Sequence, residues 1–185
     1  MSNTREQFAH IIQQCRTTFL AKTSDYGTSW RVYRPISVAD QIYIKARRIR
    51  NIQENAIQKI GDDIPSEFQG IINYSIIGLI QLDLTEEDPE QLDPATVANM
   101  YDDKVNLAMN LMADKNHDYG EAWRAMSEES FADLILAKIL RIKQIIGNKG
   151  HTQVSEGIDA NFFDILNYAV FALILREEAT ISNQT

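Results

Sequence analysis

Hydrophobic residues recur near the start of the chain at the spacing of an α-helix. The first apolar stripe, with steps of three or four residues, consists of Phe8, Ile12, Cys15 and Phe19. A second stripe with the same steps consists of Tyr101, Val105, Ala108 and Met112. Side chains at these steps share one face of a helix, so both segments are predicted to be amphipathic helices. Because Ala108 stands where the first stripe has Cys15, we interpret the cysteine as a core residue and not as a catalytic thiol.

Two further helices are predicted in each half of the chain. Residues 38–58 are expected to form a helix with Ser37 as its N-cap, and its counterpart around Ile135, Ile139 and Ile142 should begin at Ser127 or Ser130. Residues 66–82 and 159–178 are apolar on most faces and should be the buried centre of the molecule. No stretch alternates as a strand would, so the predicted fold class is all-α.

One motif occurs twice, 93 positions apart. The first copy contains Lys22, Asp25, Tyr26, Gly27, Trp30 and Arg31, and the second contains Lys115, Asp118, Tyr119, Gly120, Trp123 and Arg124. The first helix of each half is expected to end at the glycine, and the tryptophan should fold back into the core. The match continues to Asn73 and Asn167 after one residue of slippage. The chain is therefore an internal duplication, predicted to form a helical bundle of two tandem three-helix repeats with pseudo-twofold symmetry.

This duplication divides the chain into four parts. Residues 1–84 form the first repeat, 85–99 an acidic, proline-containing linker, 100–179 the second repeat and 180–185 a tail that is expected to fray. The acids of the linker are expected to be solvated.

Composition and charge narrow the possible functions. A formal net charge of −8 argues against a generic nucleic-acid coat, although it is compatible with a small anionic ligand such as a nucleotide or deoxynucleotide. The single cysteine fits a reducing compartment. The polar start predicts no leader, and the apolar stretch 165–175 is too short to span a bilayer. We therefore expect a cytoplasmic protein without membrane contact, which could pair as a homodimer.

Acidic residues of the second half could form a metal site. Asp118, Asp133 and Asp164 come from three consecutive elements, and Glu156 and Asp159 are an acid pair three residues apart. Carboxylates from facing helices can converge in a bundle, where a hard cation such as Mg²⁺, or Mn²⁺, would suit them. Each acid also has a structural alternative, since acids are common at helix starts and turns. Asp164 stands out because apolar residues surround it and a buried carboxylate requires a partner.

Basic residues in the same half could neutralise phosphates. Lys115, Lys138 and Arg141 are the candidates, with surface ion pairs as the structural alternative. Trp123 could stack on a base or could be a structural core residue. The first half has Gly70 where the second has Asp164, so we expect a degenerate site there. Lys22, Asp25 or Lys45 could still reach the more complete site from the first half.

The combined pattern resembles a known family. Lys115-Asp118-Tyr119-Gly120, Asp133-Lys138-Arg141 and Asp164-Asn167-Tyr168-Ala169 are similar to the motifs of the nucleotide modification associated domain 1 family. That family resembles the MazG-like, all-α nucleoside triphosphate pyrophosphatases. The resemblance implies a MazG-like bundle that uses Mg²⁺ to hydrolyse a nucleotide between its α and β phosphates. The chain departs from those enzymes in having no good Glu-x-x-Glu pair, and Glu156 and Asp159 are its only Glu-x-x-Asp candidate in the second half.

Two hypotheses follow. In the first, the protein is a Mg²⁺-dependent nucleotide pyrophosphohydrolase or a related nucleotide-processing enzyme, with Asp133 and Asp164 as catalytic residues. Its metal would be held by Asp133, Asp164, Glu156 and Asp159, with Asp118 as an alternative ligand. The residues expected to bind the substrate are Lys115, Asp118, Tyr119, Trp123, Lys138, Arg141, Asn167 and Tyr168. In the second hypothesis, the protein is a non-catalytic nucleotide-binding or protein-interaction scaffold.

Overall fold

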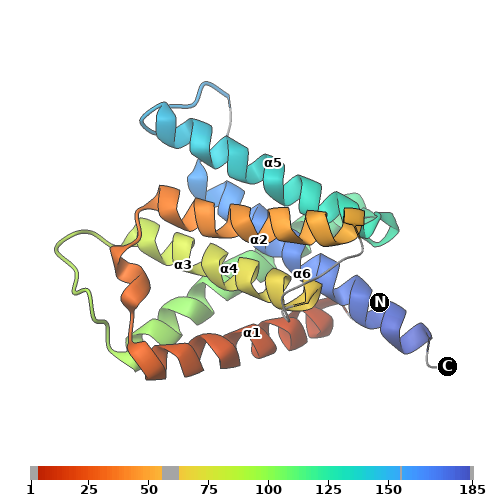
Figure 1. Ribbon diagram of the computed structural model, residues 1–185, viewed down its shortest axis with the longest axis horizontal. Helices are drawn as coiled ribbons and strands as arrows, with labels where there is room; N and C mark the ends of the chain where they lie inside the picture. Colours follow the sequence, from red (N-terminus) through yellow and green to blue (C-terminus); the bar gives the residue numbers. More distant parts are fainter. Residues whose placement is uncertain (1–3, 56–62, 155, 184–185) are drawn as a thin grey trace.

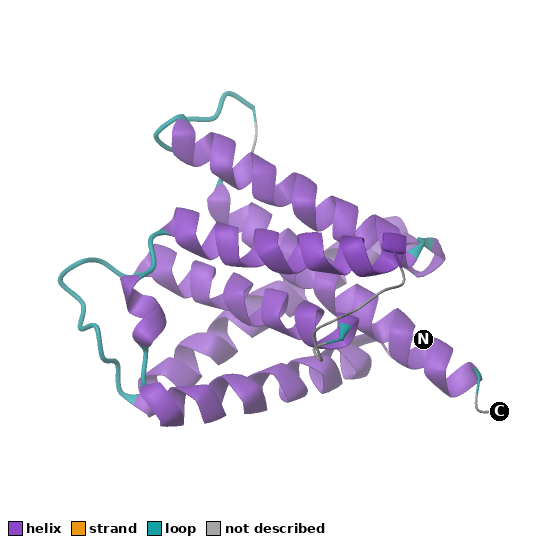
Figure 2. Ribbon diagram, in the orientation of Figure 1, coloured by secondary structure: helices purple, strands orange, loops and turns teal. Residues whose placement is uncertain are grey.

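The computed structural model describes residues 4–55, 63–154 and 156–183. These residues form helices, turns and loops and contain no strand (Figures 1 and 2). The helices are α1 (Thr4–Tyr26), η1 (Ser29–Val32), α2 (Pro35–Asn55), α3 (Ile64–Asp83), α4 (Pro94–Tyr119), η2 (Ala122–Ala125), α5 (Glu128–Gly147) and α6 (Ile158–Ser182). The order of helices is the same in both halves, which confirms the predicted all-α fold class.

Each long helix packs against its own counterpart from the other half. α3 packs on α6, α2 on α5 and α1 on α4, and the cross-contact of α1 with α6 is matched by one of α4 with α3 (Figure 1). A contact surface that pairs each element with its equivalent is characteristic of twofold symmetry. The two repeats are therefore arranged as two subunits of a symmetric dimer would be, joined in one chain.

The glycines of the repeated motif end the first helix of each half, as predicted. Gly27 and Gly120 have φ angles of +66° and +62°, in the left-handed region that a residue without Cβ adopts most easily. Each donates its backbone N–H to a carbonyl four residues earlier at 2.9 Å. A single 3₁₀ turn, η1 or η2, follows and returns Trp30 or Trp123 to the core, where each is 7% exposed. The expectation for both tryptophans is confirmed.

Several predicted boundaries differ from the structure. α2 begins at Pro35, because proline suits the first turn of a helix, and Ser37 lies within that turn. α4 begins at Pro94 with Asp93 accepting from the Thr96 N–H, so the linker is shorter than 85–99. α6 continues to Ser182, beyond the predicted end of the second repeat. The predicted end of the second helix at 56–58 lies outside the described residues.

The third helix of each half contributes most to the core. α3 and α6 place long runs of buried side chains between the other helices. α6 is also the one described helix that is long and apolar enough to cross a membrane, but 67% of the relevant window is buried inside the protein, as in the core helix of a bundle. Cys15 is fully buried in α1, where burial raises the pKa of its thiol to about 12, in agreement with a core role.

The linker is attached to the first half by two residues of the repeated motif region. Thr28 accepts a hydrogen bond from the Leu92 N–H and donates its hydroxyl to the Glu90 carbonyl. The Arg31 guanidinium donates to the carbonyls of Pro89, Thr85 and Asp88. The linker is therefore held against the end of α1 and is not a freely solvated connection.

Candidate functional site

Asp164 lies at the centre of a cluster of charges in the second half. Its Oδ1 is 2.5 Å from the Lys115 Nζ and its Oδ2 is 2.5 Å from the Lys138 Nζ, while the residue is only 7% exposed. Lys115 comes from the end of α4 and Lys138 from the middle of α5, so the carboxylate on α6 joins three helices. Burial alone would raise the pKa of Asp164, but the hydrogen bonds and charges of the two lysines outweigh it and lower the pKa. The predicted partner of Asp164 is therefore a pair of lysines.

The four acids assigned to a metal site do not come together. Asp133 is 60% exposed on α5 and lies 3.5 Å from the Arg50 guanidinium of α2. Glu156 and Asp159 are exposed at the start of α6, and both oxygens of Asp164 are hydrogen-bonded to lysines. Within the described part of the chain, no group of three or more acids, histidines or cysteines could hold a metal ion. This donor set does not fit the expected Mg²⁺ or Mn²⁺ site, because a hard cation requires several oxygen ligands close together and the described acids supply no such group.

The remaining predicted contacts divide into exposed and structural residues. Asp118 and Tyr119 are each 74% exposed at the end of α4. Asn167 is buried and donates its Nδ2 to the Ala108 carbonyl, which ties α6 to α4. Tyr168 is half-buried, and its pKa is raised by burial and by the charge of Asp164, so of these four residues it is the one beside the charged cluster.

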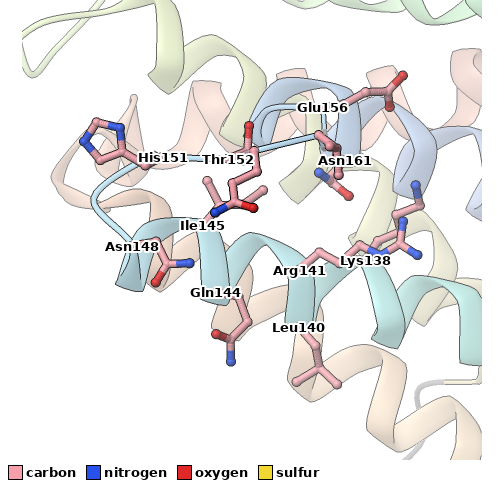
Figure 3. Close-up of a pocket in the computed structure, with 12 residues that line it drawn as sticks. Lys138, Leu140, Arg141, Gln144, Ile145, Asn148, His151, Thr152, Glu156 and Asn161 are labelled. Carbon is pink, nitrogen blue, oxygen red and sulfur yellow. The ribbon is translucent and has the colours of Figure 1, made fainter.

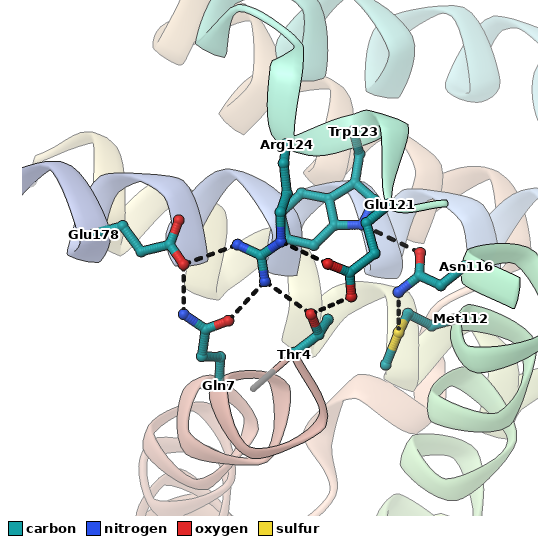
Figure 4. A network of polar contacts seen from close by, with 8 residues as sticks. All are labelled: Thr4, Gln7, Met112, Asn116, Glu121, Trp123, Arg124 and Glu178. Atoms are coloured by element: carbon teal, nitrogen blue, oxygen red, sulfur yellow. Dashed lines mark hydrogen bonds and ion pairs between the residues drawn. The ribbon is translucent and has the colours of Figure 1, made fainter. Parts of the chain in front are cut away.

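Trp123 is part of a structural network. Its ring stacks on Phe171 at 4.2 Å with an interplanar angle of 5°, and its Nε1 donates to the Asn116 Oδ1 at 3.1 Å. The Arg124 guanidinium covers the same ring at 4.4 Å from the centroid and forms ion pairs with Glu121 and Glu178 (Figure 4). Both faces and the polar edge of the indole are used within the protein, so Trp123 is not available to stack on a nucleobase.

A cleft of about 820 Å³ lies beside the charged cluster, between α5 and the loop before α6. Lys138 and Arg141 project from α5 toward the start of α6, where Glu156 and Asn161 line the other side (Figure 3). Arg141 is exposed and forms no hydrogen bond or ion pair with the residues that the structure describes. The volume lies within the range of small-molecule sites. Of the predicted residues, this cleft brings together Lys138, Arg141 and Glu156.

The loop before α6 contributes residues that the sequence did not reveal as candidates. The cleft is also lined by polar residues of this loop and of the end of α5, namely Gln144, Asn148, His151, Thr152 and Gln153. They have no counterpart in the repeated motif, so a comparison of the two halves could not single them out. The lone His151 had no motif around it, and its position in the cleft follows only from the path of the loop.

The first half carries its buried carboxylate one helical turn earlier. Gly70 corresponds to Asp164, but Glu67, three residues before it, is 5% exposed and forms ion pairs with Lys45 and Arg48. These two cations correspond to Lys138 and Arg141. In the second half the carboxylate therefore forms ion pairs with two lysines, Lys115 and Lys138. In the first half it forms ion pairs with one lysine and the arginine, Lys45 and Arg48. Each repeat thus has one carboxylate in this buried cluster, and a different cation, Lys22 or Arg141, forms no ion pair with an acid among the described residues.

Comparison with known proteins identifies one relationship. A family model described as nucleotide modification associated domain 1 matches the chain twice, over residues 22–82 and 115–175. Each match extends from the lysine of the repeated motif to the last turns of the third helix. No curated protein and no solved structure matches the chain.

Proposed function

The chain belongs to the nucleotide modification associated domain 1 family, and on this basis we propose that it binds a nucleotide or deoxynucleotide in the cleft beside α5. The observation that carries the proposal is the position of Arg141, a cation that no described residue neutralises, at the wall of a cleft of about 820 Å³. A guanidinium presents several donors in a plane and binds phosphate oxygens in pairs. The cleft has a cation where the phosphates of a nucleotide would need one.

The charges around the cleft favour an anionic ligand. Lys138 and Arg141 carry two positive charges at the cleft wall and Glu156 one negative charge, while Lys115 and Asp164 form an ion pair beside it. The local balance is therefore positive in a protein whose net charge is −8. Such a local field attracts phosphates selectively to this face of the molecule.

Hydrolysis of the nucleotide, as in the MazG-like pyrophosphatases, is the finer proposal, and the resemblance of the motifs supports it. In this role Lys138 and Arg141 would bind phosphate oxygens and stabilise the charge that develops on them. We derive no metal-dependent step, because the described acids do not form a site that fits the metal. Binding without turnover is the second candidate, favoured by the pairing of Asp164 with two lysines.

A binding experiment with matched arginine variants tests the proposal. Titration calorimetry with ribo- and deoxyribonucleoside triphosphates, with and without Mg²⁺, should show binding that Arg141→Gln weakens about tenfold or more, since a charge-assisted hydrogen bond contributes about 1.5–3 kcal/mol. Arg47→Gln is the control, because Arg47 is also exposed and lies on α2 outside the cleft. Equal affinities of the two variants, or no binding to the unmodified protein, would contradict the assignment of the cleft.

Pyrophosphate and monophosphate release measured in the same samples separates the two candidate functions. Release that depends on Lys138, tested by Lys138→Met, would support hydrolysis. Binding without any release, from every nucleotide and with either metal, would support a binding module.

A further inference from the structure

The first half contains a second cavity, of about 430 Å³, between α1, η1, α2 and α3. It shares no lining residue with the cleft beside α5. Its lining includes Lys22, Lys45, the Glu67 carboxylate and five aromatic residues, namely Phe19, Tyr26, Trp30, Tyr33 and Tyr74. Cationic groups and aromatic rings in one cavity of this size are typical of a site for a small ligand with a ring and a negative charge.

This cavity can take an anion because Gly70 stands where the second half has Asp164. In the second half the Asp164 carboxylate neutralises Lys115, the counterpart of Lys22. In the first half there is no side chain at this position, and the acid one turn away is paired with Lys45 and Arg48. Lys22 consequently has no hydrogen bond or ion pair with any residue described by the structure. The second half thus shows that a pair of lysines at these positions, Lys115 and Lys138, binds an anionic group, the Asp164 carboxylate.

The Lys45 side chain occupies the space beside Gly70, where the glycine has no side chain of its own. A Cβ at this position would lie 2.8 Å from the Lys45 Cε and 3.1 Å from its Nζ. The lysine side chain now rests over the bare backbone of α3, and its flexible end can move when a ligand arrives. The first half therefore has the cation, and the room that the second half has filled with its own carboxylate opens when the end of the Lys45 side chain moves.

The aromatic walls provide the second part of the site. Tyr33 and Tyr74 lie with ring centroids 6.5 Å apart and an interplanar angle of 30°. Trp30 also lines the cavity, and its buried Nε1 has no hydrogen-bond partner, whereas the Nε1 of Trp123 donates to Asn116.

From these contacts we propose that the cavity of the first half binds a nucleoside monophosphate, with its phosphate at Lys22 and Lys45 and its ring among the tyrosines. The single phosphate takes the place that the Asp164 carboxylate has in the second half. Room for one ring and one phosphate matches a cavity about half the volume of the cleft beside α5. The proposal names a different site from that of the proposed function, and either can hold when the other fails.

Installing the missing carboxylate tests the proposal. Gly70→Asp would give Lys22 and Lys45 the partner that Lys115 and Lys138 have, and Gly70→Asn is a control of equal size without the charge. Both replace a glycine within a helix, where a side chain does not oppose the backbone conformation. Titration calorimetry with the four deoxynucleoside 5′-monophosphates and with inorganic phosphate should show binding of a monophosphate that Gly70→Asp weakens at least tenfold relative to Gly70→Asn.

Two further measurements make the outcome decisive. Lys22→Gln should weaken the same monophosphate, while Arg47→Gln, at an exposed position of α2 outside both the cavity and the cleft, should leave its affinity unchanged. Thermal melts of all variants verify that they fold. The proposal is overturned if no monophosphate binds at millimolar concentration, if Gly70→Asp and Gly70→Asn bind it equally, or if inorganic phosphate binds as tightly as the monophosphates.

Discussion

A difference between two equivalent asparagines, the half-buried Asn73 and the buried Asn167, leads to a test of how much one hydrogen bond contributes to this fold. Asn73 donates its Nδ2 to the Cys15 carbonyl at 3.1 Å, and its Oδ1 accepts from the Tyr101 hydroxyl at 2.9 Å. Its counterpart Asn167 donates to the Ala108 carbonyl in the same way, but its Oδ1 is buried without a partner. The reason is that the position equivalent to Tyr101 is Phe8, which has no hydroxyl. The second asparagine therefore lacks one bond that the first one has.

Removing that bond from the first asparagine should destabilise the protein. Tyr101→Phe removes the hydrogen bond to the half-buried Asn73 Oδ1, which costs about 0.5–1.5 kcal/mol of unfolding free energy. For a chain of 185 residues this corresponds to a melting temperature lowered by about 2–4 °C for each kcal/mol. Urea denaturation at 25 °C measures the change directly, and the slope of the transition should stay constant, because the variant exposes the same surface on unfolding.

The reciprocal substitution distinguishes this explanation from a general effect on packing. Phe8→Tyr places a hydroxyl at the position that pseudo-twofold symmetry relates to that of Tyr101, where it can donate to the Asn167 Oδ1. It should raise the unfolding free energy by up to about 1 kcal/mol although Phe8 is fully buried. A loss in Phe8→Tyr as large as that in Tyr101→Phe would refute the reasoning, and so would a Tyr101→Phe variant as stable as the unmodified protein.

Two further predictions concern stability. The pKa of Asp164 is lowered in the folded protein, so its contribution to the free energy of unfolding is present above the unfolded pKa of about 3.9 and is lost as the pH falls through the lower folded pKa. Urea denaturation at a series of pH values should show this loss of stability. Asp164→Asn should abolish the pH dependence and lower the free energy of unfolding by roughly 3 kcal/mol at neutral pH. Gly120→Ala should cost about 1 kcal/mol from its φ of +62° alone, since a Cβ there meets nothing within 4 Å. Gly27→Ala should cost more, because a Cβ there would overlap the Gln91 side chain, and equal melting temperatures for the two variants would contradict this.

The elements of the fold were predictable because they depend on local patterns that occur twice. The stripes around Phe8 and Tyr101 and the glycines at 27 and 120 determine helices and their ends without reference to the rest of the chain. Some boundaries were less predictable, because several residues compete for one role. Ser37 is a good N-cap, but Pro35 begins the helix two residues earlier.

The candidate site was only partly predictable, because the sequence shows residue types but not the reach of side chains. The burial of Asp164 and its need for a cationic partner followed from the apolar residues around it, and the structure places Lys115 and Lys138 there. The expected convergence of the proposed metal ligands was wrong for Asp133, because this residue lies on the surface near Arg50. Gly70 was interpreted as the loss of a functional acid, although Glu67 supplies a carboxylate one turn earlier.

The displacement of one carboxylate by a single helical turn has a consequence for how this molecule can evolve. In a homodimer of identical subunits, every substitution alters both copies of a site together, so the two copies cannot acquire different ligands. Fusion of the repeats through the linker at 84–93 removes that constraint while the contacts of α3 with α6 and of α2 with α5 preserve the dimer-like interface. The difference between positions 70 and 164 then gives one chain two unequal charge clusters on a nearly symmetric scaffold, and a substitution in one leaves the other unchanged.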